Sequence, residues 1–194
     1  TMRALILGGT GQLGTALRRL LPDAVPPGRA TIDLTDPATI DAFDFSSFDA
    51  VINAAAHTDV DGAETDDGRT RAWAANAHAV AHLARAARRD DFTLVHVSSD
   101  YVFDGTAHTY DEHAPFAPLG VYGQSKAAGD LAAAAAPDHL IVRASWVVGD
   151  GKNFVATMAS LADRGISPTV IDDAHGRLTF TQDLAEGILH LLTR

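Results

Sequence analysis

Short apolar runs alternate with longer amphipathic stretches along the whole chain. Continuous apolar runs predict buried strands, and apolar residues at helical spacing predict helices that cover them. Regular alternation of the two predicts an α/β protein with a doubly wound parallel sheet and helices on both faces. No internal repeat or linker interrupts it, so we expect one domain over residues 2–194. We expect strands at 3–7, 50–56, 92–98, 139–148 and 169–171, and helices at 15–21, 69–89, 121–135, 154–164 and 182–192.

The segment after the first predicted helix departs from this regular pattern. Residues 22–29 are rich in proline and glycine, so we expect the second strand to be short or irregular. The helix that follows has a clear start, because Asp36 is a suitable N-terminal cap and Pro37 fits the first helical position.

Three glycines follow the first predicted strand. Gly8, Gly11 and Gly14 are spaced as G-x-x-G-x-x-G at the mouth of the first helix. Glycine permits a tight turn and lets backbone N–H groups approach a pyrophosphate, and the helix N-terminus adds favourable partial charge for the phosphates. The pattern therefore predicts a Rossmann-like dinucleotide site. The alternative is a glycine-rich turn that only packs the helix on the strand.

The end of the second strand normally selects the dinucleotide. An acidic residue there favours a free ribose 2′-hydroxyl, whereas an arginine suits a 2′-phosphate. Arg29 lies near this end and favours the phosphorylated cofactor, and Asp33 follows, close to the expected position of the adenine or its ribose. Both NADP(H) and NAD(H) therefore stay open, with NADPH slightly favoured, and plain loop charge is the alternative for both residues.

A tyrosine and a lysine lie four residues apart in the helix predicted at 121–135. Tyr122 and Lys126 would share one helix face, about one turn apart. There the ammonium group can favour the phenolate, and a tyrosine whose pKa is lowered in this way can exchange a proton with a hydroxyl or ketone. This pair indicates oxidoreductase chemistry if a hydride carrier binds nearby. A surface tyrosine beside a surface lysine is the alternative.

A serine pair ends the strand predicted at 92–98. The hydroxyl of Ser99 would face the crevice above the strand ends, where Tyr122 should arrive, and could orient a substrate oxygen. The alternative is a strand-terminal serine that caps the backbone. We expect His57 and His96 to be core or loop residues rather than acid–base groups.

Charge and composition exclude several classes of protein. The formal net charge of −10 disfavours a nucleic-acid backbone as partner. No apolar run approaches the length of a membrane span, so we expect no membrane partner. The absence of cysteine excludes disulfides and thiolate catalysis, and it fits a cytoplasmic protein.

Five segments together resemble one family. They span residues 3 to about 187, and the order in which they occur is that of the dTDP-4-dehydrorhamnose reductase family, within the extended short-chain dehydrogenase/reductase superfamily. The glycine loop is common to many families, whereas the other segments are specific in combination. The segments are 8–14 (GGTGQLG), 53–61 (NAAAHTDVD), 98–103 (SSDYVF), 121–129 (VYGQSKAAG) and 143–147 (RASWV).

The resemblance implies a role for each site residue. Ser99, Tyr122 and Lys126 would form the catalytic trio, in which the lysine binds the nicotinamide ribose and lowers the tyrosine pKa. Tyr101 and Trp146 would contact the sugar, although core packing is the alternative for the tryptophan. Small side chains would pass under the cofactor, and further residues would line its pyrophosphate and adenosine ends. These cofactor residues are Gly8, Gly11, Gln12, Leu13, Asp33, Leu34, Ala54, Ala55 and Ala56.

The sequence also departs from the family in three places. Members are usually longer, with a C-terminal part that helps to clamp the thymidine nucleotide, so we expect a substrate lobe that is largely missing here. A late family motif, Phe-Gly-x-Pro-Thr, is replaced by His-Gly-Arg-Leu-Thr at 175–179. Some members join subunits through magnesium held partly by a carboxylate of the first helix. The matching position here is about Ala16, so we predict no metal.

The leading hypothesis is a reductase that transfers hydride from NAD(P)H to the C4 ketone of dTDP-4-dehydro-6-deoxy-L-mannose. Its product would be dTDP-L-rhamnose or a related deoxysugar, and its partner a dTDP-sugar, with a homodimer as a compatible assembly. One alternative is a non-catalytic NADP-binding regulatory subunit that resembles the one of methionine adenosyltransferase. Another is a reductase or epimerase of a different sugar nucleotide.

Overall fold

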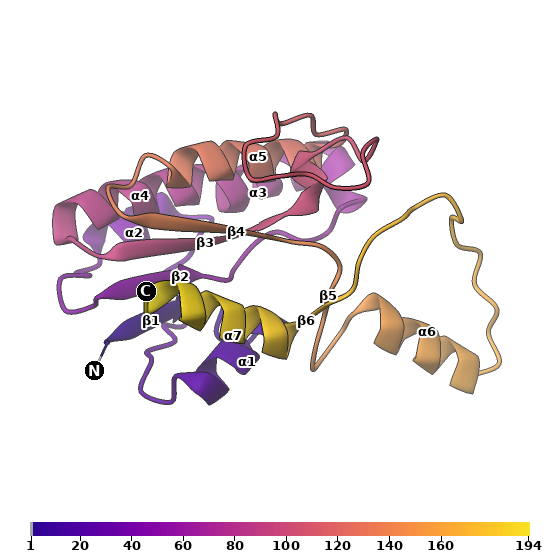
Figure 1. Ribbon diagram of the computed structural model, residues 1–194, viewed down its shortest axis with the longest axis horizontal. Coiled ribbons are helices and arrows are strands. Elements are labelled where there is room, and N and C mark those ends of the chain that lie inside the picture. Colours follow the sequence, from indigo (N-terminus) through magenta and orange to yellow (C-terminus); the bar gives the residue numbers. More distant parts are fainter. Residues whose placement is uncertain (1) are drawn as a thin grey trace.

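A four-stranded parallel sheet forms the centre of the computed structural model, which describes residues 2–194 (Figure 1). Its strands are β1 (Ala4–Leu7), β2 (Ala50–Asn53), β3 (Thr93–Ser99) and β4 (His139–Ala144), in the order β1-β2-β3-β4. All three pairings are parallel. The α/β class and the parallel sheet predicted from the sequence are therefore confirmed.

The irregular second strand is reduced to a single residue. Val25 bridges to the outer side of β1, where it accepts a hydrogen bond from Ile6 N (2.9 Å) and donates one to Ala4 O (2.9 Å). The chain thus leaves β1 toward one side and returns as β2 on the other. In such sheets the crevice for a ligand lies where the strand order reverses, at the carboxyl ends of the strands. Here that point is the end of β1, where the glycine loop begins.

Helices cover both faces of the sheet, which is therefore doubly wound as predicted (Figure 1). One face carries α1 (Gln12–Leu20) and α7 (Thr181–Leu192), and the other carries α2 (Pro37–Ala42), α3 (Asp66–Trp73), α4 (Ala79–Asp90) and α5 (Val121–Ala133). Alternate side chains of β1 pack into two separate hydrophobic cores, one on each face of the sheet. Leu5 and Leu7 pack with Leu83 of α4, whereas Ile6 packs with Leu17 of α1 and Ile188 of α7.

Local signals explain where two of the helices begin. The Asp36 carboxylate accepts a hydrogen bond from Ala38 N (3.2 Å), and Pro37 is the first residue of α2, as expected. Helix α1 begins at Gln12, three residues before the predicted start. Because Gly11 is already its N-terminal cap, the helix starts inside the glycine loop rather than after it.

The long helix predicted at 69–89 is interrupted. Helices α3 and α4 are joined by η2 (Ala74–His78), a π-helical turn, and the two short 3₁₀ segments are η1 (Gly62–Glu64) and η3 (Asp100–Val102). Asn76 lies within the π turn and is 1% exposed. Single π turns inside α-helices often occur at functional sites.

The C-terminal third differs most from prediction. The strand expected at 139–148 ends at Ala144, and β5 (Val147–Val148) pairs instead with β6 (Thr179–Phe180) in a separate parallel sheet. The strand expected at 169–171 is wrong. Val170 and Ile171 are 53% and 76% exposed, and no strand of the described chain pairs with them.

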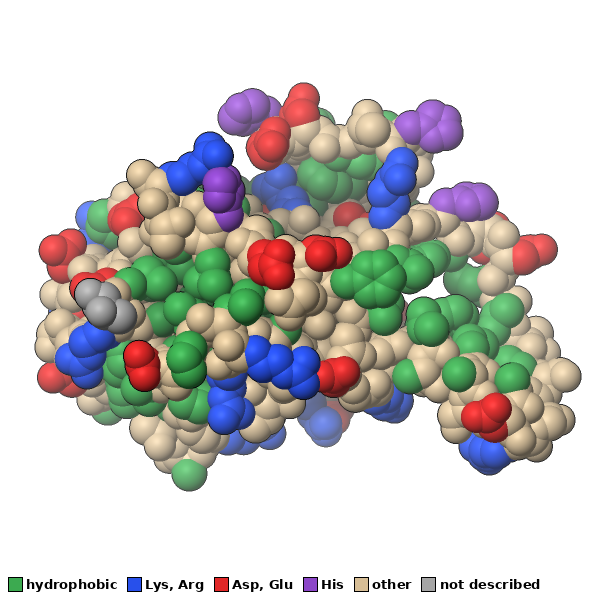
Figure 2. All heavy atoms as spheres, turned by 60° about the horizontal axis from the view of Figure 1, so that its bottom comes forward, with side chains coloured by type: hydrophobic (Ala, Val, Ile, Leu, Met, Phe, Trp, Pro, Cys, Tyr) green, Lys and Arg blue, Asp and Glu red, His purple; other side chains and the backbone are tan. Residues whose placement is uncertain are grey.

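Helix α6 (Phe154–Asp163) and the segment after it form an arm that extends away from the sheet (Figure 1). None of the residues of α6, all of which the structure describes, is buried. Hydrophobic side chains lie on the surface of this arm, at the right of Figure 2, and Phe154 and Leu178 are 63% and 51% exposed. In residues 2–194, no helix is long and apolar enough to cross a membrane.

Candidate functional site

The glycine loop has a conformation and a packing that require glycine. Gly8 has φ of +78°, and a Cβ atom there would lie 2.9 Å from backbone atoms of Ala55. A Cβ atom on Gly14 would lie 2.1 Å from Gly8 O. The loop is closed by a hydrogen bond from Gly11 N to Gly8 O (3.0 Å). The loop therefore packs directly on the segment after β2, and α1 packs directly on the loop.

The start of α1 leaves backbone donors free of a side-chain cap. No side-chain oxygen of the described residues caps the helix at Gly11, so its first N–H groups are available to an anion. Only the backbone of Leu13 is available to a ligand at the loop, because its side chain is buried in the core against the sheet. The Gln12 side chain is engaged elsewhere, since its Oε1 accepts hydrogen bonds from Gly149 N (2.9 Å) and Asn153 Nδ2 (3.2 Å).

A cleft of about 490 Å³ opens at the end of β1. Of the predicted cofactor residues, Gly8, Arg29, Asp33, Leu34, Ala55 and Ala56 line it. Gly11, Gln12, Leu13 and Ala54, which the structure also describes, do not. Sequence reasoning missed further lining residues, and Thr10, Arg18, His57 and Arg71 are the polar ones among them that lie outside the second-strand region.

The end of the cleft that Arg29 and Asp33 line carries both signals for cofactor choice.

 Asp33 Oδ1 accepts hydrogen bonds from Thr35 Oγ1 (2.7 Å) and Thr35 N (2.9 Å). These bonds hold the pKa of Asp33 below its usual value, and the charge of Arg29 adds to the effect. An ionised carboxylate and a guanidinium thus lie at the same end of the cleft, which suits either a free ribose hydroxyl or a 2′-phosphate.

Lys126 is buried beneath the predicted catalytic face of α5. Its side chain is among the largest fully buried ones, and its Nζ donates a hydrogen bond to Val97 O of β3 (2.7 Å). Burial lowers the pKa of Lys126 to about 8, and the charge of Asp130 opposes this decrease. Lys126 is therefore an internal cation held against the sheet, not a surface lysine.

The pKa of Tyr122 is raised, whereas the sequence predicted that Lys126 would lower it. Burial raises the pKa of the phenol above its ordinary value; a hydrogen bond with the Ser99 side chain lowers it in part, and the Asp100 charge raises it. Lys126 is not among the groups that lower it. The phenol is therefore protonated at neutral pH, which suits a proton donor rather than a standing phenolate.

Ser99 ends β3 and serves two purposes at once. Its Oγ accepts a hydrogen bond from Tyr101 N (3.2 Å) and so caps η3. Ser99 is therefore also the strand-terminal capping serine that the sequence allowed. The same hydroxyl donates to Asp100 Oδ1 (3.3 Å) and interacts with the phenol of Tyr122. The structure thus brings Ser99 and Tyr122 together from β3 and α5.

The two predicted sugar-contacting residues lie on segments that meet at Asp100. Tyr101 is 38% exposed, and its ring stands edge-on to that of Tyr122, with centroids 5.6 Å apart. Trp146 occupies the turn between β4 and β5. Its neighbour Ser145 donates a hydrogen bond to Asp100 Oδ2 (2.6 Å), which ties this turn to the end of β3.

The catalytic candidates and the cleft belong to different parts of the same sheet edge. Ser99, Tyr122 and Lys126, all described, are not among the residues that line the 490 Å³ cleft. Asn76 connects the two parts, although sequence reasoning missed it. Its side chain accepts from His57 N (2.8 Å) and donates to His57 O (3.0 Å) and to Ser125 Oγ (3.0 Å). The signal available in the sequence was a single asparagine within an alanine-rich helix.

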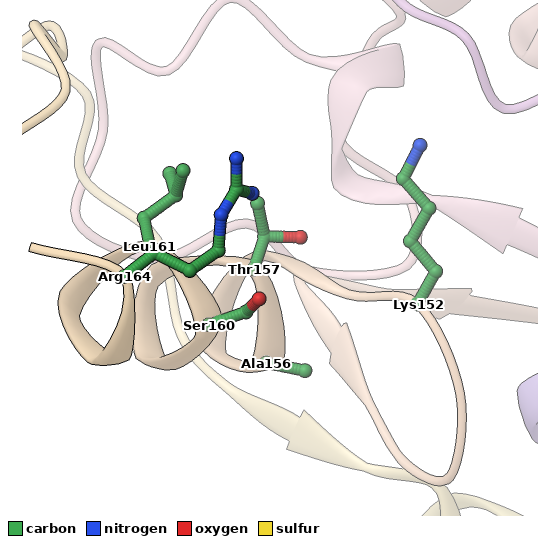
Figure 3. A pocket seen from close by; sticks show the side chains of 6 residues that line it. All are labelled: Lys152, Ala156, Thr157, Ser160, Leu161 and Arg164. Atoms are coloured by element: carbon green, nitrogen blue, oxygen red, sulfur yellow. The ribbon is translucent and has the colours of Figure 1, made fainter. Parts of the chain in front are cut away.

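A second, smaller hollow lies on the arm. It has a volume of about 240 Å³, and Figure 3 shows its lining side chains on α6 and on the loop before it. None of the predicted site residues, all of them described, lines this hollow. Among the described residues, no group of three histidine or acidic side chains could hold a metal ion. The residues lining the hollow are Lys152, Ala156, Thr157, Ser160, Leu161 and Arg164.

Comparison with known proteins gives a consistent result. The family model described as RmlD substrate binding domain matches residues 2–194. A dTDP-4-dehydrorhamnose reductase of Mycobacterium tuberculosis is 43% identical over 204 residues, which cover 97% of this chain and 65% of the relative. A protein of the same name from Burkholderia thailandensis is 39% identical and covers 98% of this chain and 66% of the relative. The chain thus spans slightly less than two thirds of the curated relatives.

Solved structures agree with this assignment. A dTDP-4-dehydrorhamnose reductase of Clostridium acetobutylicum has a TM-score of 0.91 and 35% identity, covering 99% of this chain and 70% of that one. One from Bacillus anthracis, solved in complex with NADP, has a TM-score of 0.89 and 33% identity, covering 100% and 71%. The family resemblance and the Rossmann-like fold predicted from the sequence are therefore confirmed. The chain belongs to the family of the RmlD substrate binding domain, that of the dTDP-4-dehydrorhamnose reductases.

Proposed function

We propose that the full-length protein reduces the C4 ketone of dTDP-4-dehydro-6-deoxy-L-mannose with NADPH and forms dTDP-L-rhamnose. The observation that carries this proposal is the meeting of Ser99, Tyr122 and Lys126 at the junction of β3 and α5. The names of the relatives support the substrate class.

The residues at the end of β1 fit a dinucleotide. Gly8 and Gly14 leave no room for a Cβ atom, so the loop packs closely on Ala55 and on the start of α1, and the uncapped start of α1 provides N–H donors for phosphates. Ala55 and Ala56 form a floor of small side chains. We propose that Gly8, Gly11 and Leu13 bind the pyrophosphate through their backbones, and that Gln12 holds the neighbouring loop in place.

The adenosine end supports NADPH as the preferred cofactor. Arg29 lines it and can pair with a 2′-phosphate, and Asp33 and Leu34 line the same end. The Bacillus anthracis relative, solved with NADP, supports the same choice. NADH remains a compatible second cofactor because the Asp33 carboxylate can accept hydrogen bonds from a free ribose.

A bound reduced nicotinamide would supply the hydride for the ketone carbon. Tyr122 donates its phenolic proton to the ketone oxygen, so that hydride and proton together convert the ketone into a secondary alcohol. The raised pKa of the phenol keeps this proton in place until the oxygen becomes basic. Ser99 holds the same oxygen by a hydrogen bond and stabilises the phenolate that forms, while the Lys126 ammonium would bind the nicotinamide ribose.

Tyr101 and Trp146 are proposed to contact the sugar. Tyr101 stands beside the phenol of Tyr122 and is partly exposed, so its ring can form one wall of the sugar site. Trp146 is held near the end of β3 through the Ser145–Asp100 hydrogen bond. A cyclic sugar offers apolar C–H faces that pack well on aromatic rings, which is the contact that both residues can provide.

The direct test is to mix full-length protein with NADPH and dTDP-4-dehydro-6-deoxy-L-mannose and follow the absorbance of the reduced nicotinamide. Tyr122→Phe should lose at least ~100-fold of the rate and keep its affinity for NADPH. Tyr110→Phe is the matched control, because Tyr110 stacks on Phe103 outside the site and should keep the rate. Cofactor binding without reduction of this or any other sugar nucleotide would contradict the proposal and favour a non-catalytic subunit.

A further inference from the structure

Three polar residues of α5 lie on one face, one helical turn apart. Tyr122, Lys126 and Asp130 follow each other at intervals of four residues. The first two are proposed catalytic residues, and the third has no part in the reaction described above. Lys126 and Asp130 are only 2% and 1% exposed. A buried carboxylate is costly unless nearby groups compensate its charge, so its presence calls for a reason.

The Asp130 carboxylate is fixed from one side only. Its Oδ2 accepts a hydrogen bond from Arg143 Nε of β4 (2.8 Å). Its Oδ1 has no hydrogen-bond partner among the described residues, and it lies 3.7 Å from His96 Nε2. One oxygen therefore anchors the carboxylate, while the other points into the buried space between β3 and α5.

His96 does not supply a charge to this space. It is fully buried on β3, and burial together with the charge of Lys126 holds its pKa well below the ordinary value, so the imidazole is neutral. Asn53 Nδ2 lies 3.3 Å from His96 Nδ1, and Asn53 Oδ1 accepts from Ala55 N. With the amide donating to Nδ1, the imidazole proton lies on Nε2 and faces Asp130.

Among the described charged groups around Lys126, only one can compensate the positive charge of its buried ammonium. Arg143 of β4 is a cation and is engaged with Asp130. Asp100 of η3 acts on the phenol of Tyr122 and accepts a hydrogen bond from Ser145, and in the described residues it accepts none from Lys126. The hydrogen bond from Lys126 Nζ ends on Val97 O, a neutral carbonyl. Asp130 is thus the buried carboxylate that lies one helical turn from Lys126 on the same face of α5, and its charge raises the pKa of the ammonium.

We propose that Asp130 is the buried counter-charge of Lys126, with Arg143 holding its carboxylate in position. Asp130 does not touch the reacting atoms, and it acts through Lys126. Its importance for catalysis rests on the reductase function proposed above, whereas its effect on the lysine does not.

The charge of Lys126 can be measured without any catalysis. The chain has only two lysines, Lys126 and the exposed Lys152. Labelling lysine with ¹³C at Cε therefore gives two signals, and Lys152 serves as an internal reference. In the wild type the Lys126 signal should titrate near pH 8. In Asp130→Asn its midpoint should move down by about one pH unit, while that of Lys152 stays in place.

Controls separate this effect from loss of structure. Asp23→Asn changes an exposed aspartate after α1 and should leave both midpoints unchanged. Asp130→Glu keeps the charge and should restore the midpoint toward the wild-type value. If Asp130→Asn fails to fold, Arg143→Met gives the opposite test. Removal of that cation strengthens the field of Asp130 on Lys126, so the midpoint should rise. An unmoved Lys126 midpoint in the folded variant would overturn the proposal.

The catalytic consequence follows in the full-length enzyme. The rate of Asp130→Asn should fall with rising pH earlier than that of the wild type, with about a tenfold loss at pH 8 relative to pH 6. A purely structural role would lower the rate equally at both pH values and would contradict this part. A shifted NMR midpoint with no reductase activity in the wild type would sink the proposed function and leave the role of Asp130 intact.

Discussion

The sheet with its glycine loop and the arm around α6 are built on different principles. In the sheet, β1 and β2 are entirely buried, and each face is closed by its own helices. In the arm, α6 has no buried residue among those described, and apolar side chains such as Phe154 face the solvent. The cleft at the glycine loop is therefore held by a packed core, whereas the turn that carries Trp146 borders a region with little packing of its own.

The largest effect should come from the glycine loop. Gly14→Ala places a Cβ atom 2.1 Å from Gly8 O, so the loop must shift, and affinity for NADPH should fall at least ~100-fold. Gly28→Ala lines the same cleft but meets no atom within 4 Å, and it should bind NADPH normally. Isothermal titration calorimetry measures both. Normal binding by Gly14→Ala would show that the loop does not hold the cofactor.

Truncating a side chain should lower the free energy of unfolding much more in the sheet region than in the arm. Leu17→Ala removes a fully buried side chain between α1 and the sheet and should lower the free energy of unfolding by about 2–5 kcal/mol. Phe154→Ala on the arm should change it by less than ~0.5 kcal/mol. Urea denaturation tests both. Equal losses would show that the arm packs as firmly as the sheet.

High pH should reveal the buried lysine. The folded-state pKa of Lys126, about 8, lies below its unfolded value, so between these values the unfolded chain binds more protons and stability rises with pH. We expect a gain of about 1–2 kcal/mol between pH 8 and 9.5 relative to Lys126→Met, which lacks this titration. The comparison uses chemical denaturation across this range. Parallel pH profiles for the two proteins would contradict a buried ammonium.

The smallest effect concerns the hydrogen bonds by which Gln12 of α1 holds the loop that leads into the arm. Gln12→Ala removes the amide that accepts from Gly149 N and Asn153 Nδ2, and it should cost about 1 kcal/mol. Backbone amides of residues 149–153 should then exchange hydrogen faster, while those of β1 keep their protection. Unchanged exchange at 149–153 would mean that Gln12 does not hold this loop.

The sequence predicted the sheet region better than the arm, for a physical reason. Apolar runs such as 3–7 and 92–98 become strands because neighbouring strands and helices bury them, and the glycine spacing is dictated by close backbone contacts. The run at 169–171 is also apolar, but no strand of the described chain pairs with it, so it stays exposed. Apolar patterning predicts a strand only where a partner strand is present.

The site followed the same rule. The i, i+4 spacing of Tyr122 and Lys126 correctly placed both on one helix, but it could not show that burial raises the phenol pKa. Nor could it show that Lys126 is held by Val97 O, because that contact joins segments 29 residues apart. Asn76 and Asp130 were missed for the same reason, since their partners lie on other elements.

The most direct test of the account follows the hydride itself. Full-length protein is given NADPH deuterated at the reactive C4 position together with dTDP-4-dehydro-6-deoxy-L-mannose, and the product is analysed by mass spectrometry. We predict one deuterium on the sugar with the wild type, and at least ~100-fold slower transfer with Tyr122→Phe at unchanged NADPH affinity. Equal transfer by the two proteins, or a wild type that binds NADPH and leaves the sugar unlabelled, would contradict the assignment of Tyr122 as the proton donor of a reductase.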